Sequence, residues 1–174
     1  MLSVRVAVYI ACCFALLLSA DLKAQEDRPV TFYTGVGGAF TFGSLGHYSD
    51  IGYLGMAGIG LKPSPLTAPE LEIVGRFQYI RFPAGNSDSV DFEYLIGGID
   101  LKLNRLFAQQ PNTFMIVGGG ASRTKHNLAE YSPYATLAVG LESGLLVLEA
   151  RLLMVFGNEI KTSSFLPVTL GLRF

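Results

Sequence analysis

The sequence predicts an all-β protein, an eight-stranded antiparallel up-and-down transmembrane β-barrel preceded by a cleaved signal peptide. Beyond residue 24, the chain divides into eight segments of about 9 to 14 residues in which apolar residues recur at every second position. Half of all residues are apolar, yet no apolar run in this part reaches the ~18 to 20 residues that a membrane helix needs. Charged residues gather on the face opposite the apolar one, as the strands of a membrane barrel require.

Residues 1–24 have the features of a secretory signal peptide. Arg5 supplies the positive charge at its start, residues 6–19 are apolar, and a small-residue cleavage site follows. We expect cleavage after Ala24, with Ala20 as the alternative, and a single barrel domain at 25–174. The apolar segment is too short for a membrane anchor.

The composition also limits the chemistry of the mature chain. Both cysteines, Cys12 and Cys13, lie in the signal segment, so we expect neither a disulfide nor a thiolate metal site. The net charge of −1 gives no electrostatic basis for binding nucleic acid.

The alternation places the strands in order along the chain. We expect them at about 30–42, 51–62, 70–82, 90–103, 113–123, 134–142, 146–156 and 165–174. The third is the clearest, because Leu71 and Ile73 share one face while Glu72 and Arg76 share the other. The prolines between residues 63 and 69 cannot continue a ladder, so they mark a turn.

The fourth segment changes parity in the middle. Its first half puts Phe92, Tyr94 and Ile96 on one side, whereas its second half puts Asp100 and Lys102 on that side. A β-bulge at the glycine pair 97–98 would bring the apolar residues of both halves to one face. A turn follows at 104–112, with one helical turn expected around residue 106.

The second half of the chain alternates in the same way. A polar loop is expected at 125–133, and the pair 143–144 makes a tight turn into the seventh segment. That segment has the composition of a helix, but Glu149 and Arg151 share a side only at strand spacing, which favours a strand. The last segment alternates to the terminal Phe174, and Pro167 within it should leave one ladder bond unmade.

The connections alternate in character too. One set, at 62–69, 104–112 and 143–145, is proline-rich or tight, and we expect it to be periplasmic. The other set, at 43–50, 83–89, 124–133 and 157–164, is polar and is expected to be extracellular. Most of the 20 glycines fall within strands, where they permit sharp coiling and relieve crowding in a narrow barrel.

Charges of both signs are expected to point into the lumen of the barrel. The predicted lumen charge network comprises Glu72, Arg76, Glu93, Lys102, Glu142, Glu149, Arg151 and Arg173, with Asp91 and Asp100 on the same face. In so narrow a lumen these charges should pair and plug it rather than conduct. An ion-selective path and a catalytic acid/base pair are the alternatives.

Aromatic residues near strand ends are expected to form interfacial girdles, the alternative being the core of a sandwich. Most of them share the parity of the apolar face: Phe32, Phe42, Tyr53, Phe77, Tyr79, Phe92, Tyr94, Phe114 and Phe156.

The segment from His47 to Asp50 contains a His-x-Ser pair, which resembles the motif of outer-membrane lipid A deacylases. The resemblance implies that His47 would activate Ser49 for ester hydrolysis. Two features depart from that motif, since Asp50 replaces an Asn and Leu61 stands where a Glu is expected. We therefore expect polar loop residues, no catalytic site and no enzyme, and the lone His126 adds no metal site.

Taken together, the signal segment, the eight alternating segments and the Leu-Gly-Leu-Arg-Phe end resemble small Gram-negative outer-membrane barrels of the OmpA/OmpX or opacity type. The resemblance implies an outer-membrane location among its lipids. It also implies insertion by the barrel assembly machinery, with the assembly signal carried by Phe174, Leu172, Leu170 and Val168. We expect a monomer with a structural or envelope role and no cofactor. A narrow transport barrel, an adhesin, a lipocalin-like ligand binder and a lipid A-modifying enzyme remain alternatives.

Overall fold

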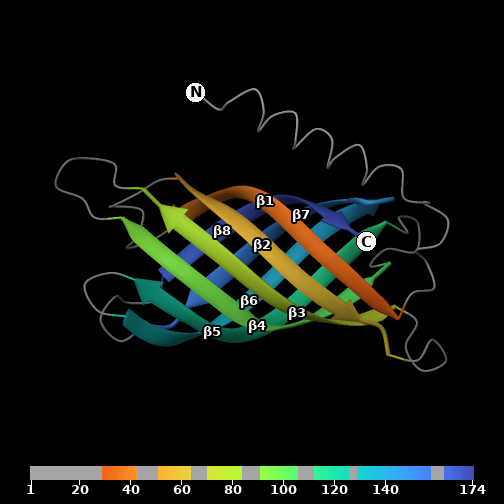
Figure 1. Cartoon of the computed structure of the whole chain (residues 1–174), viewed down its shortest axis with the longest axis horizontal. Coiled ribbons are helices and arrows are strands. Elements are labelled where there is room, and N and C mark those ends of the chain that lie inside the picture. The colour runs from red at the N-terminus through yellow and green to blue at the C-terminus, as the bar shows by residue number, and fades with distance from the viewer. Residues whose placement is uncertain are drawn as a thin grey trace, which may run out of the picture.

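The computed structural model shows eight antiparallel strands that close into a barrel in sequence order, the first pairing with the last (Figure 1). The strands are β1 (Val30–Phe42), β2 (Ile51–Leu61), β3 (Leu71–Phe82), β4 (Phe92–Asn104), β5 (Thr113–Lys125), β6 (Ala129–Ser143), β7 (Leu146–Val155) and β8 (Ser163–Arg173). The structure describes residues 29–42, 51–63, 70–83, 91–105, 112–125, 129–157 and 163–174, with backbone only at 129–130. The predicted closed, all-β, eight-stranded antiparallel barrel is therefore confirmed.

The register fixes the tilt of the strands. Pairings followed from Gly38 through β2, β3 and β4 reach Lys125, whereas those followed through β8, β7 and β6 reach Met115. The stagger around the barrel is thus 10 residues (125 − 115). With eight strands, this stagger corresponds to a tilt of about 40° to the barrel axis. Along one row of paired residues, from Gly38 on β1 to Lys125 on β5, each residue therefore lies farther along the barrel axis from the chain termini than the one before.

We call the end that holds Val30 and Phe174 the termini end, and the end that holds Phe82 and Lys125 the distal end. At the termini end, the backbone of Phe32 and Phe174 is joined by reciprocal hydrogen bonds of 3.0 and 2.9 Å. These bonds continue the β1–β8 ladder to the last residue, so the final residue takes part in closing the barrel.

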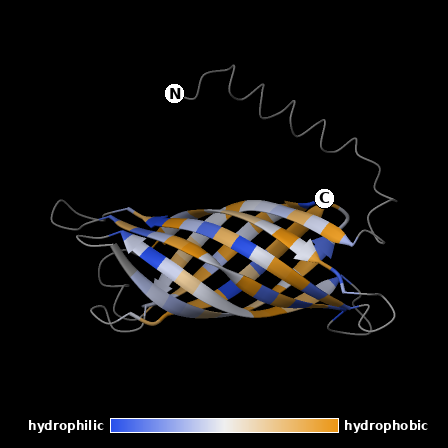
Figure 2. Cartoon of the chain, turned by 60° about the horizontal axis from the view of Figure 1, so that its bottom comes forward, coloured by the Kyte–Doolittle hydropathy of each residue, from blue (hydrophilic) through white to orange (hydrophobic). Residues whose placement is uncertain are grey.

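The wall has an apolar outer face and a mixed inner face. Val36, Ile99 and Leu170 are 68%, 62% and 57% exposed, whereas Glu72 and Asp100 are fully buried. Figure 2 shows the resulting alternation of hydrophobic and hydrophilic residues along each strand. Apolar side chains outside and charges inside invert the pattern of a soluble barrel and suit a bilayer.

Interior glycines make room for large neighbouring side chains. A Cβ atom at Gly60 would overlap the carboxylate of Glu72, and one at Gly118 would overlap that of Asp100. Both glycines face the lumen, so the crowding they relieve lies inside the barrel, as the sequence indicated.

The bulge predicted at residues 97–98 is wrong. The pairings of β4 with β3 and β5 run through this pair without interruption. Phe92, Tyr94 and Ile96 consequently point into the barrel, on the same side as Asp100 and Lys102. The change of parity in the sequence marks a change in the lining of the lumen, from apolar to charged, and not a kink in the strand.

The fifth and sixth strands are longer than the sequence indicated. Their pairing extends to Lys125 and Ala129, so residues 129–133 belong to β6 and not to a loop. The seventh segment is a strand and not a helix. The β7–β8 ladder is interrupted between the pairs Ala150–Val168 and Leu153–Phe165, at the position of Pro167, because proline lacks a backbone N–H.

Several expectations lie outside the described residues. These are the signal peptide at 1–24, the helical turn around residue 106, the segment from His47 to Asp50, and His126. Within the described ranges, no helix is long and apolar enough to cross a membrane.

Candidate functional site: the charged lumen

Four charged side chains form a closed ring in the lumen, which we call the quartet: Arg76, Asp100, Glu149 and Arg151. Asp100 Oδ2 lies 2.8 Å from Arg76 Nε and 2.9 Å from Arg151 Nη2. Glu149 Oε1 lies 3.0 Å from Arg76 Nη1 and 2.8 Å from Arg151 Nε. Each cation thus contacts both anions, and the quartet is neutral as a unit.

Alternation along the strands builds the quartet. Arg76 comes from β3 and Asp100 from β4, while Glu149 and Arg151 stand two residues apart on the inner face of β7. All four side chains are at most 4% exposed. Ile99 and Leu101, which flank Asp100 in β4, face outward on the lipid-exposed surface, so the quartet lies at membrane depth. Charges so buried are tolerated only when paired and hydrogen-bonded.

A second group, the mouth cluster, lies toward the termini end and comprises Tyr33, Glu72, Lys102, Glu142 and Arg173. The Tyr33 hydroxyl is 2.8 Å from Glu72 Oε1 and accepts a hydrogen bond of 2.9 Å from Lys102 Nζ. Lys102 also pairs with Glu142, which accepts a hydrogen bond of 2.8 Å from Arg173 Nη1. Two cations therefore balance two anions at this end of the lumen.

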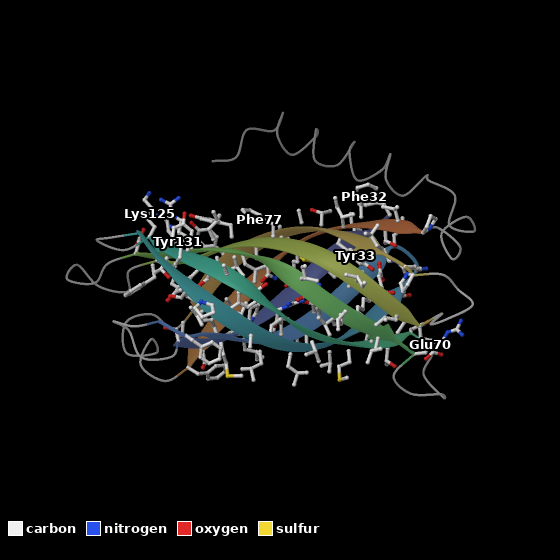
Figure 3. All side chains as sticks on the ribbon, turned by 90° about the horizontal axis from the view of Figure 1, so that it is seen from below. Phe32, Tyr33, Glu70, Phe77, Lys125 and Tyr131 are labelled. Atoms are coloured by element: carbon white, nitrogen blue, oxygen red, sulfur yellow. The ribbon has the colours of Figure 1, made fainter. Side chains whose placement is uncertain are left out.

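Two aromatic rings lie beside Lys102 of the mouth cluster, and Lys62 is close enough to interact electrostatically with its charges. The Lys102 ammonium lies 4.7 Å from the centre of the Phe114 ring and 4.9 Å from that of Tyr33, within cation–π range. Lys62, just beyond β2, has a pKa that is lowered first by burial and then by the charge of Arg173. Tyr33 and its neighbour Phe32 point to opposite sides of the wall, and both are labelled in Figure 3.

The distal half of the lumen is lined mainly by apolar side chains, with a few small buried polar ones such as Ser122 and Ser132. Its centre, the aromatic plug, consists of Phe82, Tyr94 and Phe165, with ring centres 5.1 to 6.1 Å apart. Phe82 and Phe165 are fully buried, and Tyr94 is 2% exposed. The lumen is therefore layered, with ion pairs toward the termini end and packed rings toward the distal end.

The structure places most of the predicted network in the lumen, divided between two groups. Arg76, Glu149 and Arg151 belong to the quartet, whereas Glu72, Lys102, Glu142 and Arg173 belong to the mouth cluster. Asp100, expected on the same face, joins both arginines of the quartet. Alternation alone could not show where along the barrel each charge would lie.

Glu93 must be corrected, because it lies on the outer face. Its neighbours Phe92 and Tyr94 are buried, and Glu93 Oε1 lies 3.8 Å from Arg81 Nε. Asp91, which was expected inside with it, also pairs with Arg81, and the side chains of both partners are more than a third exposed. The error follows from the bulge, since with that bulge Glu93 would have faced the lumen.

The assignment of the aromatic residues needs the same correction. Phe32, Phe42, Tyr53, Phe77 and Phe156 are exposed on the outer face, as expected of membrane-facing rings. Phe92, Tyr94 and Phe114, however, line the lumen. Tyr33 lies on the inner face of β1, as the alternation indicates, but its place within the charge network was not predicted.

The predicted assembly residues lie on the outer face of β8 and at its end. Leu170 is 57% exposed, and Val168 and Leu172 share its parity in the strand. Phe174 follows directly after the strand and pairs with Phe32 through its backbone. Arg173, between Leu172 and Phe174, turns inward to Glu142. The tail therefore presents apolar side chains outward and one charge inward.

The charged groups in the lumen form ion pairs and hydrogen bonds with one another. The carboxylates of the quartet and the mouth cluster are each paired with lysine or arginine, and the Tyr33 hydroxyl is bonded on both sides. Among the described residues, no group of three or more His, Cys, Asp or Glu side chains could hold a metal ion. This arrangement can stabilise and close a barrel.

Comparison with solved structures finds the same architecture. A crystal structure of Neisserial surface protein A (NspA) matches with a TM-score of 0.61 and 15% identity, over 84% of this chain and 96% of that one. The Yersinia pestis outer membrane protein Ail in a nanodisc matches with a TM-score of 0.57 and 13% identity, over 83% and 98% of the two chains. A crystal structure of Ail, the attachment invasion locus protein of Y. pestis, gives 0.55 and 12%, over 83% and 97%.

No protein-family model and no curated protein sequence matches the chain. The similarity is therefore one of fold, accompanied by the inside-out distribution of apolar and charged side chains. The chain is an eight-stranded β-barrel with the OmpA/OmpX-like fold of small outer-membrane proteins.

Proposed function

We propose that the protein is a structural component of the cell outer membrane, where it contributes to the integrity of the envelope. The observation that carries this proposal is the filled lumen. Two neutral charge groups and an aromatic plug occupy it in succession, with fully or nearly fully buried side chains at each level. Side chains so arranged stabilise a wall and leave no path for a solute.

The proposed topology has the termini end in the periplasm. The connections at 43–50, 83–89 and 157–164 would then be extracellular, as would the short connection between β5 and β6. The barrel would act as a monomer, surrounded by outer-membrane lipids, after insertion by the assembly machinery. The single β-barrel closes without a second chain, which supports the monomer.

We expect the purified protein to give no steady single-channel current in planar bilayers. Ions would have to cross the fully buried rings of Phe82 and Phe165, where the loss of hydration is not compensated. Conductance traces at several voltages provide the measurement. Steady, voltage-independent currents from the pure protein would contradict the plugged lumen and would favour the transport alternative.

A different experiment tests the assembly signal. Phe174→Ala keeps the two backbone hydrogen bonds to Phe32 and removes only the terminal ring, so it separates recognition from barrel closure. We expect several-fold less heat-modifiable barrel in the outer-membrane fraction. Arg173→Ala is the matched control, because it removes an inward-facing side chain next to it, and it should leave this yield almost unchanged.

The two variants can also fail in an informative way. If Phe174→Ala assembles as well as the native chain, the terminal ring is not a recognised signal. If Arg173→Ala loses as much yield as Phe174→Ala, the defect reflects a weakened end of the barrel and not recognition.

A further inference from the structure

Charged residues on the outer face of the barrel are confined to one place. On the described strands, the outward charges are Arg81 on β3, Glu93 on β4, and Arg123 and Lys125 on β5. All four lie toward the distal end, and Arg81, Glu93 and Lys125 form one register row. The outward positions of the other five strands carry no charge, so this patch is not a belt around the barrel.

The cations of this patch differ in how closely they are paired with carboxylates. Arg81 is paired with Asp91. Lys125 Nζ, with a side chain that is 79% exposed, reaches Glu93 Oε2 only at 3.8 Å, and Glu93 is shared with Arg81. Arg123 lies 5.7 Å from the centre of the Tyr131 ring and pairs with no carboxylate among the described side chains. Arg123 and Lys125, two residues apart on one face, are therefore available to an external anion.

The position of Arg123 and Lys125 along the outer wall indicates that the external anion is the headgroup of a lipid. The register climbs toward the distal end from β1 to β5, so Lys125 stands higher than Tyr53 and Arg81 in the same row. Tyr131, 72% exposed beside Arg123, is typical of the membrane–water interface. In Figure 3, Lys125 and Tyr131 lie together at the end opposite Glu70. Phosphate groups of lipids occupy this level, and guanidinium and ammonium groups bind them.

Below this pair, small residues form the outer surface of the wall, and we call this area the low surface. The outward positions there are Gly97, Gly119, Ala121 and Ala135, and the register places Gly97 beside Ala121 and Gly119 beside Ala135. Larger side chains flank this low surface, including Leu95 and Leu137, which are 40% and 47% exposed. An acyl chain can approach the backbone here more closely than elsewhere, and it would extend directly from a phosphate held by Arg123 and Lys125.

We propose that Arg123 and Lys125 bind the phosphate of an outer-leaflet lipid whose acyl chain lies on this low surface. The chemistry fits lipid A, a phosphorylated and acylated disaccharide. The membrane lipid, and not soluble phosphate, is the occupant, because the cations stand at the upper limit of an apolar surface. The charge of Glu93 orients the site, since it repels phosphate from β4 and leaves β5 as the contact.

The experiment uses the native barrel in phosphatidylcholine nanodiscs that contain a small fraction of lipid A. Native mass spectrometry measures the fraction of barrels that retain a lipid A molecule. Arg123→Gln and Lys125→Gln should each weaken retention about fivefold, the effect of one basic residue at a membrane surface. Arg105→Gln, which removes an exposed cation at the termini end, is the matched control and should leave retention unchanged.

The low surface has its own pair of variants. A side chain added at either Gly97 or Gly55 would meet no protein atom within 4 Å of its Cβ position, so both substitutions are compatible with the fold. Gly97→Leu fills the low surface and should lower retention, whereas Gly55→Leu on β2 should not.

Three results would overturn the proposal. The first is equal retention by the native barrel, Arg123→Gln and Lys125→Gln. The second is equal retention of lipid A and its dephosphorylated form, which would show that the phosphate is not recognised. The third is displacement of lipid A by millimolar inorganic phosphate, which would identify a phosphate site and not a lipid site.

Discussion

Replacing Arg151 with methionine is expected to destabilise the folded barrel by about 3 to 5 kcal/mol, the range for breaking a buried ion pair by removing one partner. Arg151 is 1% exposed, and it contacts Asp100 at 2.9 Å and Glu149 at 2.8 Å. Without it, Arg76 faces two buried carboxylates, and the quartet acquires a net negative charge at membrane depth. The measurement is the free energy of unfolding from urea titrations in lipid vesicles.

A matched control and a double variant show whether the quartet acts as a unit. Arg105→Met makes the same chemical change at an exposed arginine outside the lumen, so it should change the unfolding free energy little. Adding Asp100→Asn to Arg151→Met leaves only Arg76 and Glu149, which balance. The double variant should therefore lose less stability than the sum of the single changes. Equal losses in Arg151→Met and Arg105→Met would show that the quartet is not the buried ring described.

Phe165→Ala is the second change with a large expected effect, again about 3 to 5 kcal/mol. The ring is fully buried, and its centre lies 5.1 Å from that of Tyr94 and 5.6 Å from that of Phe82. Removal leaves a cavity that two flanking rings on different strands cannot fill, because each is held by its own strand in a closed barrel. The same urea titration gives the free energy.

Phe42→Ala is the matched control for the plug. It removes the same side chain near the same end of the barrel, but from the outer face, where the ring is 47% exposed and no internal cavity results. We expect a loss of about 1 kcal/mol, because roughly half of the apolar area of the ring is involved. If Phe165→Ala costs no more than Phe42→Ala, the distal half of the lumen is loosely packed and the plug is not a barrier.

The sequence alone determined the strands and most of the inner face. Alternation places most strands close to their observed bounds, apart from the start of β6, since successive side chains in a strand must point to opposite sides. It also assigned Glu72, Arg76, Glu149 and Arg151 to the inner face, because a charge is costly in lipid. The apolar alternation of residues 166–174, together with the other alternating segments, suggested this class of barrel.

Only the tertiary structure decided what the lumen contains at each level. A strand read by itself shows which residues share a face but not whether that face is charged or apolar along its length. In β4, Tyr94 and Asp100 share the inner face, but aromatic rings from β3 and β8 meet the first, whereas arginines from β3 and β7 meet the second. The stagger of the closed barrel sets these levels, and it depends on pairings between distant segments that no local pattern records.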